Sequence, residues 1–509
     1  MRYIHYNILI ICIFLFPFTL QAFDNVSTKS MGLAGAVTAS PPGLMAIHHN
    51  PAGLYQAREG LVYHQSLHSL KLKQKNCFSP DPSFEVLNLQ SSQDPVANQE
   101  SGKSNTCLYY PFYGDAHGEH MLLPLPVGST YRPTKSRLIM AIGSYMPFFQ
   151  GIQFSPDDSS QYQTQQYYHQ HFVYAAPAIA YQWSPSFSMG LSIGFGQTAW
   201  GQNGRLRILN ERFAKSQFLP PVPDVGPFDG LADMQLELRD DMALSFNLGF
   251  LWKPIKKLTL GCVYRSSIST NPNGHLDIHF SDDFMALTKY CRDNPYFSKQ
   301  LDSSGLELIQ QQHTSNTVEL EQLEWPDTLQ VGAQYKISNA IQIMFDIQWT
   351  RWSCQDSYQL VFNDKNNPLS LLLDSLDQSA GQAITYPTNM KDTVSYHLGI
   401  EWQLKESFKL RNGISYHPKS VADSHLNLMH QPDTIYFGTG FEWRWPNRWV
   451  IEQAIGYFVS KNQKIKNSKQ LNYWDTDSSF FAPYSGQVVS SKVSGIEFSL
   501  SVKIPLSSS

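Results

Sequence analysis

The sequence lacks the features of a helical membrane protein, a nucleic-acid binder or a disulfide-rich domain. After residues 1–22 it has no apolar run of about 20 residues, the length that a membrane-spanning helix needs. Charged residues make up only 16% of the chain and give a net charge of −4, so no basic excess exists to neutralise nucleic-acid phosphates. Aromatic residues are abundant instead, at 13%. This composition favours an aromatic-rich β protein.

Residues 1–22 have the pattern of a cleaved signal peptide. Arg2 is positively charged, residues 8–20 are mainly apolar, and Ala22 is a plausible small residue before the cleavage point. An uncleaved anchor helix is the alternative, and the short apolar core disfavours it. Export predicts a periplasmic, outer-membrane or secreted protein.

The body of the chain repeats one pattern, in which apolar residues alternate with polar or small ones. The pattern runs through residues 244–252 and resumes after a turn at 253–257 that contains proline and three lysines. Strict alternation predicts β-strands with one apolar and one polar face. Further stretches of this kind lie at 329–336, 341–350, 394–402, 408–416, 435–445, 449–457 and 496–504.

Two all-β folds fit such strands: a soluble sandwich, or an outer-membrane barrel whose apolar face meets lipid. Many of the strands run for about 9–11 residues or longer, which a tilted strand needs to cross a bilayer. Trp and Tyr cluster at strand ends, as in the aromatic girdles of membrane barrels. These residues are Trp252, Tyr264, Tyr335, Trp349, Trp352, Trp402, Tyr416, Trp443, Trp445 and Trp449. The pattern therefore favours the membrane barrel.

Short turns and long polar stretches alternate along the chain. Short turns lie near 133–136, 184–186, 253–257, 337–340, 404–407 and 446–448. Long stretches lie near 71–119, 151–167, 201–235, 271–326, 354–391, 418–432 and 461–491. In bacterial barrels the short turns are periplasmic and the long loops are extracellular. The breaks predict an all-β fold for 57–509, a fourteen-stranded antiparallel transmembrane β-barrel.

Residues 23–56 do not alternate and are rich in glycine and proline turns. A segment this short does not fold alone, so burial inside the barrel as a plug, or hatch, is expected. A disordered periplasmic tail is the alternative, and the apolar content of the segment disfavours it.

Two motifs in this segment resemble a known family. Met31-Gly32-Leu33-Ala34-Gly35 and His49-Asn50-Pro51-Ala52-Gly53-Leu54 are similar to the N-terminal hatch of the long-chain fatty acid outer-membrane transporter (FadL) family. The likeness continues, in the order and spacing of the family, at 177–181, 247–251, 260–266, 349–353 and 432–438. The sequence departs from the family in its long first loop and in lacking a terminal aromatic residue.

The resemblance implies a fourteen-stranded barrel, located in the bacterial outer membrane, for passive uptake of long-chain fatty acids or similar hydrophobic compounds. Aromatic hydrocarbons are an alternative ligand class. It further implies capture on extracellular loops, a hatch that gates the exit, and a sideways exit through a defect in the third strand. The matching hatch motif here is Gly32, Gly35, Asn50, Pro51, Ala52 and Gly53.

Several residues are candidates for these steps. Phe213, Phe218 and Leu219 form an apolar stretch in loop 201–235 that suits ligand capture, unless the loop packs on its neighbours. In strand 137–148, Gly143 weakens the strand and Pro147 cannot donate a ladder hydrogen bond. A break in pairing is one outcome, and a strand that simply ends at Pro147 is the other.

Three cations on polar strand faces, Arg265, Lys336 and Arg411, are candidates to pair with a carboxylate ligand, although charges in a barrel lumen are ordinary. Excluding Cys12 of the leader, five cysteines remain, and Cys77 and Cys107 are a candidate disulfide pair with a free state equally expected.

An enzyme is not predicted. Residues 190–194 match the G-x-S-x-G motif, but that motif needs a strand, a turn and a helix, whereas strand alternation continues through Ser192. No metal or cofactor is expected, because His64 and His68 on one strand would lie about 13 Å apart. The serious alternative is a general porin or a loop-displaying adhesin. Expected partners are hydrophobic ligands, outer-membrane lipid and lipopolysaccharide, with no nucleic acid and a monomeric barrel.

Overall fold

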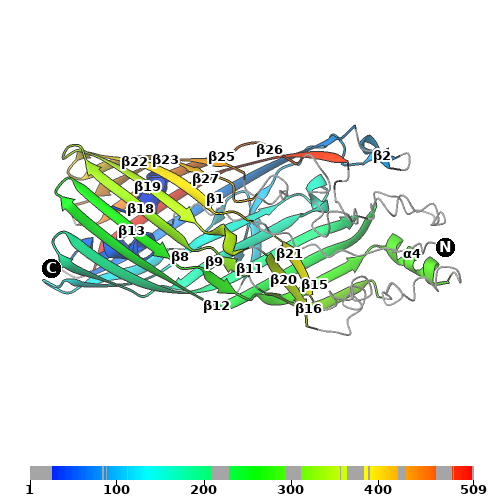
Figure 1. The fold of residues 1–509 in the computed structure, drawn as a ribbon, viewed down its shortest axis with the longest axis horizontal. Helices are drawn as coiled ribbons and strands as arrows, with labels where there is room; N and C mark the ends of the chain where they lie inside the picture. Colours follow the sequence, from blue (N-terminus) through cyan, green and yellow to red (C-terminus); the bar gives the residue numbers. More distant parts are fainter. Residues whose placement is uncertain are drawn as a thin grey trace.

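The computed structural model shows a closed antiparallel β-barrel of fourteen wall strands, which confirms the predicted fold class (Figure 1). No described helix is long and apolar enough to cross a membrane. The described residues are 26–506 without 83–84, 87–88, 112, 125, 208–228, 294–310, 322, 356, 364–382, 388–389, 422–431, 447, 466–483 and 485.

The barrel closes where its first strand meets its last, with Val62 opposite Pro505 and Pro80 opposite Gln487. In chain order the wall consists of β1 (Gly60–Pro80), β7 (Val127–Arg132), β8 (Leu138–Gln153), β9 with β10 (Gln166–Ala175, Ala178–Ser184), β11 (Phe187–Arg207), β12 (Gly230–Ile255), β13 with β15 (Leu258–Arg265, Asn273–Phe280), β16 with β18 (His313–Glu321, Thr328–Lys336), β19 with β20 (Ile341–Thr350, Ser357–Phe362), β21 with β22 (Ala383–Pro387, Thr393–Lys405), β23 (Phe408–His417), β24 (Thr434–Arg444), β25 (Val450–Ser460) and β27 (Gln487–Pro505).

Shorter elements lie mostly in the connections between the long wall strands. The strands among them are β2 (Glu85–Val86), β3 (Leu89–Gln90), β4 (Asn105–Tyr110), β5 (Gly114–Gly118), β6 (Met121–Leu122), β14 (Ile268–Thr270), β17 (Leu323–Trp325) and β26 (Gln463–Ile465). The helical pieces outside the N-terminal segment are η3 (Ser91–Gln93), η4 (Ser159–Tyr162), α4 (Asp282–Asp293) and η6 (Trp352–Cys354).

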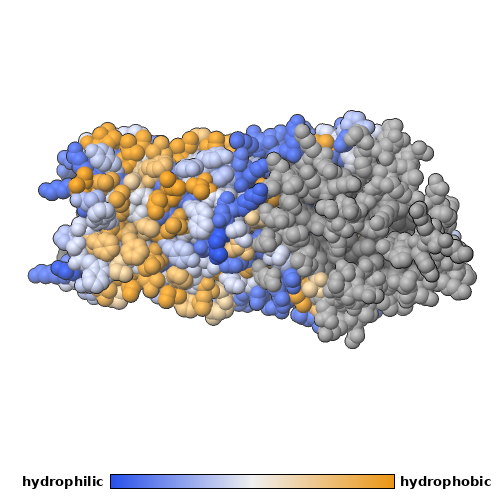
Figure 2. Space-filling model, viewed as in Figure 1, coloured by the Kyte–Doolittle hydropathy of each residue, from blue (hydrophilic) through white to orange (hydrophobic). Residues whose placement is uncertain are grey.

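On the face shown in Figure 2, apolar residues form a belt across one half of the barrel. Phe246, Phe345 and Trp443 are 43%, 44% and 46% exposed, so these large apolar side chains point outward and not into a protein core. A soluble sandwich would bury them. The outward apolar face is the arrangement of a membrane barrel.

The strands extend well beyond this belt, where the sequence predicted loops. β12 begins at Gly230 inside the predicted loop 201–235, and β15, α4 and β16 lie within predicted loop 271–326. The prediction was wrong there because outside the membrane neither strand face needs to be apolar, so alternation fades while ladder hydrogen bonds continue.

Residues 26–56 form a compact piece that lies inside the barrel at the end with the short turns (Figure 1). It contains α1 (Thr28–Gly32), η1 (Gly43–Met45), α2 (Ala46–His49) and η2 (Pro51–Gln56). Ser27 and Ser30 form a reciprocal capping box at the start of α1. Leu33, Ala36 and Val37 pack on Met344 of the wall. We call residues 26–56 the N-terminal segment.

Candidate functional site

Rows of glycine on the inner wall make room for the N-terminal segment. In the ladder Gly399 lies opposite Gly413, and Gly413 opposite Gly438, so three adjacent strands present no side chain. A methyl carbon on Gly413 would lie 2.6 Å from the backbone nitrogen of Ala34 and closer still to the carbonyl of Leu33. Gly190 and Gly249 are also paired, and they face the backbone around Pro51 in the same way. The segment therefore rests backbone-first on the wall.

Wall side chains also hold the segment by hydrogen bonds. Asp346 Oδ2 accepts from the backbone N–H of Thr38 at 2.8 Å. His397 Nδ1 donates to the carbonyl of Ala34 at 2.8 Å. Both wall residues are buried, and neither was singled out from the sequence. A polar residue in the middle of an inward strand face is the signal that identifies them.

Ile47 of α2 receives two further bonds from the wall. The hydroxyl of Ser192 donates to its carbonyl at 2.6 Å, and the Asn247 side-chain amide donates at 2.9 Å. Ser192 lies within strand β11, as its sequence alternation predicted, and binds a backbone carbonyl there.

The hatch-motif residues are buried within this contact. Asn50 donates from Nδ2 to the carbonyls of Thr38 and Phe250 at 2.9 and 3.1 Å, and its Oδ1 accepts from the Ala52 N–H. Asn50 thus ties two turns of the segment to β12. Pro51 begins η2, Gly53 packs on a proline ring, and Gly32 lies beside wall residues Gly440 and Arg411. Gly35 has a φ of +85°, a conformation that favours glycine.

A charged cluster on strands β22 to β27 lies next to the N-terminal segment, where Arg411 is beside Gly32. Arg411 is 1% exposed and donates to the carboxylates of Glu401, Glu442 and Glu452, with N–O distances of 2.7 and 2.8 Å for the first and third. Lys503 adds a second cation on Glu452 at 2.8 Å. Because its guanidinium is engaged by three carboxylates, Arg411 does not fit the predicted role of a ligand-carboxylate partner.

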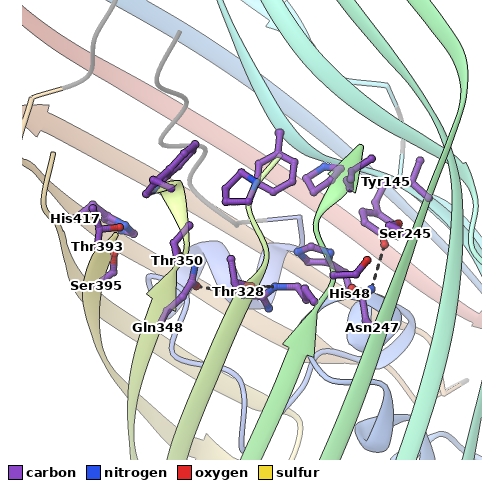
Figure 3. A pocket seen from close by; sticks show the side chains of 18 residues that line it. His48, Tyr145, Ser245, Asn247, Thr328, Gln348, Thr350, Thr393, Ser395 and His417 are labelled. Carbon is purple, nitrogen blue, oxygen red and sulfur yellow. Dashed lines mark hydrogen bonds between the residues drawn. The ribbon is translucent and has the colours of Figure 1, made fainter. Parts of the chain in front are cut away.

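A pocket lies in the lumen between the segment and the outer half of the barrel (Figure 3). Thr393, Ser395 and His417 line one side of it, and Tyr145, Ser245 and Asn247 line the other. His48 of α2 contributes to the pocket, so the segment forms part of its wall. Apolar lining comes from Pro147, Phe148, Val173, Ile268, Pro326 and Trp352.

Arg265, a predicted candidate, lines this pocket. It is 6% exposed and donates to Thr328 Oγ1 at 2.8 Å, to Gln330 Oε1 at 3.0 Å and to Gln348 Oε1 at 3.2 Å. These neutral acceptors hold a positive charge at the edge of a partly apolar cavity. Such a surface suits an amphipathic molecule with one polar end.

The wall beside this pocket has a gap in its hydrogen-bond ladder. β7 pairs with β8 only up to Val127 opposite Ser144, and the next described ladder pair on that side joins Thr106 of β4 to Ile152. Among the residues that the structure describes, no ladder pair lies between these two points. Strand β8 therefore crosses this region without a ladder partner on that side among the described residues.

Pro147 lies in this gap, inside β8 and not at its end. On the other side of the strand the register with β9 shifts between Tyr145 and Phe148, so Pro147 is at a bulge. A second cavity lies beside the gap, lined by Val26 and Met31 of the segment, by residues of β1, β8 and β27, and by Leu123, Pro124 and Pro126. Gly143, four residues before Pro147, faces Leu44 and Ile47 of the segment.

The remaining candidates are not brought to the pocket. Lys336 is the exposed last residue of β18, at a short turn. Phe213, Phe218 and Leu219 lie outside the described residues, as do residues 1–25 of the leader region.

The candidate disulfide is not formed. Cys77 and Cys107 are both free thiols, and Cys77 donates to Glu100 at 3.4 Å. Cys107 is buried beside Tyr109 and Tyr168, and burial raises the pKa of its thiol to about 12. Sequence separation alone could not show that the two side chains enter different environments.

The fold and its contents define a class: an outer-membrane β-barrel transporter in which an N-terminal segment occupies the lumen. The family model described as outer membrane protein transport protein (OMPP1/FadL/TodX) matches residues 18–504, so the chain belongs to this family. The family is one of outer-membrane transporters of hydrophobic compounds, not of enzymes.

Two solved structures are similar to this chain over almost its whole length. A Pseudomonas aeruginosa FadL homologue has a TM-score of 0.68 at 15% identity and covers 95% of this chain and 98% of its own. The toluene transporter TodX of Pseudomonas putida has a TM-score of 0.62 at 14% identity, covering 96% and 100%. At this identity the likeness concerns the fold.

Among curated proteins, the outer membrane protein NMB0088 of Neisseria meningitidis serogroup B is 22% identical over 272 residues. The match covers 53% of this chain and 53% of the relative, so the chain spans about half the length of that relative.

Proposed function

We propose that this protein takes up long-chain fatty acids or similar amphipathic hydrophobic compounds, which leave the lumen sideways through the wall at β8. Polar saccharide covers the outer leaflet and hinders free hydrophobic molecules that arrive from water. A carrier overcomes this barrier by offering an apolar site outside the membrane and a route into its core. The observation that carries the proposal is the unpaired stretch of β8 next to a lumenal pocket.

In this proposal the apolar loop residues Phe213, Phe218 and Leu219 capture the ligand. The ligand then enters the lumenal pocket, with its polar end near Arg265 and its apolar end against Phe148. The lining supports this orientation, because it contains both the Arg265 guanidinium and apolar side chains such as Phe148.

The N-terminal segment acts as the hatch. It blocks the direct path to the periplasm and also lines the cavity beside the wall gap through Val26 and Met31. A small movement of the segment would therefore connect the lumenal pocket to the gap. A general porin needs an open bore, and the packing of residues 26–56 on the wall glycines argues against one.

Uptake of labelled oleate and labelled toluene by cells with and without the gene tests the function. We expect oleate uptake to depend on the gene. Equal uptake in both strains contradicts transport, and gene-dependent uptake of toluene alone assigns the ligand to aromatic hydrocarbons.

A deletion of Pro147 tests the exit. Without the extra residue the register shift between Tyr145 and Phe148 closes, and we expect uptake to fall to the level of cells without the gene. The matched control deletes Pro254, which lies in a register shift at a short turn between Trp252 and Ile255. Retained uptake after deletion of Pro147, in a barrel that folds, contradicts the sideways route.

A further inference from the structure

The end of the barrel with the short turns carries an excess of exposed cations. Exposed Lys or Arg residues lie in or next to five of its six short turns, and exposed acids that the structure describes at this end are Glu59 and Glu406. The cations include Lys135, Lys256, Lys257, Lys336, Lys405 and Arg448. We call these six the basic rim. The whole chain has a net charge of −4, so the basic rim is a cationic region on an acidic protein.

The basic rim lies directly beyond exposed aromatic side chains. Trp252, Tyr335 and Trp449 are 51%, 47% and 41% exposed, and each is within a few residues of a rim cation. Exposed Trp and Tyr mark the level of the membrane interface. Figure 2 shows hydrophilic residues at this left-hand end, outside the apolar belt. The rim cations are therefore at the depth of lipid head groups.

Two rim cations occupy backbone positions that favour glycine. Lys135 has a φ of +57° and Arg448 a φ of +70°. Residues with long side chains are uncommon in this left-handed region, where glycine is accommodated without steric cost. In the described part of the chain the other non-glycine residues with positive φ are Ala34 and Asn98.

We propose that the basic rim binds the phosphate groups of anionic phospholipids in the inner leaflet of the outer membrane. Short turns of bacterial barrels face the periplasm, so the rim meets this leaflet. Lys and Arg extend their apolar stems along the barrel and place their charges among head groups. Bound lipid phosphates fix the depth of the barrel and enrich anionic lipid around it.

Native mass spectrometry of the detergent-solubilised protein tests this proposal, with equimolar phosphatidylglycerol and phosphatidylcholine as probes. We expect the protein to retain phosphatidylglycerol about five-fold over phosphatidylcholine, the factor that one cation near an anionic surface supplies. A rim variant changes Lys135, Lys256, Lys257, Lys336 and Lys405 to Gln. It should lose most of the preference, because five of the six rim cations are removed and only Arg448 remains.

The matched control changes five exposed lysines of the opposite half to Gln: Lys73, Lys75, Lys103, Lys461 and Lys492. Both variants lose the same charge, so only the rim variant should lose lipid selectivity. Heat-dependent gel mobility shows that each barrel is folded. Equal retention of both lipids by the unchanged protein, or equal loss in both variants, overturns the proposal. So does complete displacement of the lipid by inorganic phosphate at constant ionic strength, because the rim would then be a site for free phosphate.

Discussion

A single methyl group on the inner wall should unseat the N-terminal segment. In Gly413→Ala the new carbon would lie 2.6 Å from the Ala34 backbone nitrogen, whereas real Cβ contacts under 3.0 Å are essentially never seen. The neighbouring atoms are backbone and cannot swing aside, so the segment or the strand must move. Overpacking of this kind costs about 1–3 kcal/mol. The cost applies only while the segment is seated on the wall. The population of the displaced state relative to the seated state should therefore rise about 5- to 150-fold, at tenfold per about 1.4 kcal/mol.

Single-channel recording in planar bilayers measures this change, since an unseated segment leaves the bore open. We expect more frequent and longer open events in Gly413→Ala. The control is Gly102→Ala in an extracellular loop, where the added carbon would meet only an Asp158 oxygen at 3.5 Å. Hydrogen exchange of residues 28–38 provides a second readout. Conductance and exchange equal to those of the control would refute the reasoning that the wall glycines seat the segment.

Three other changes test separate contacts. Asp346→Leu removes the acceptor for the Thr38 N–H and should destabilise the seated segment by about 1–3 kcal/mol, seen as faster hydrogen exchange around residue 38; unchanged exchange contradicts this. Arg411→Met leaves three buried glutamates without their shared cation and should lower the free energy of unfolding by about 3–5 kcal/mol. The temperature of the heat-dependent gel shift should fall accordingly. An unchanged transition temperature would show that the cluster relaxes. Cys77 and Cys107 should give no mobility change on reduction, and Cys107 should resist maleimide in the folded protein.

The membrane part of the fold was predictable because lipid imposes a pattern on the sequence. Every strand that crosses the belt must be apolar on one face, and Phe246 and Phe345 lie outward as this rule requires. Outside the membrane the rule stops, which is why the extension of β12 back to Gly230 was missed. The sequence pattern also could not distinguish Arg265 from Arg411. Alternation predicts that both lie inside the barrel, and only tertiary contacts show that Arg411 is engaged by three carboxylates. Glycines such as Gly413 were visible on the inward face, but their role depends on which backbone packs against them.

The size of the lumenal pocket determines what must move during transport. Its volume is about 40 Å³, which accommodates a few water molecules, whereas an engineered apolar cavity known to bind benzene measures about 150 Å³. Neither an aromatic hydrocarbon nor an acyl chain fits without displacing its lining. Most strand residues of the lining are held in ladders, whereas His48 belongs to the N-terminal segment and Phe148 lies at the β8 bulge; Trp352 of η6 and Ile268 of β14 also line the pocket from outside the wall strands. Expansion of the pocket therefore draws on the two elements that also border the gap in the wall. In the proposed route, ligand entry and opening of the exit would be coupled through these two elements, and a variant that stiffens the bulge should reduce ligand binding as well as release.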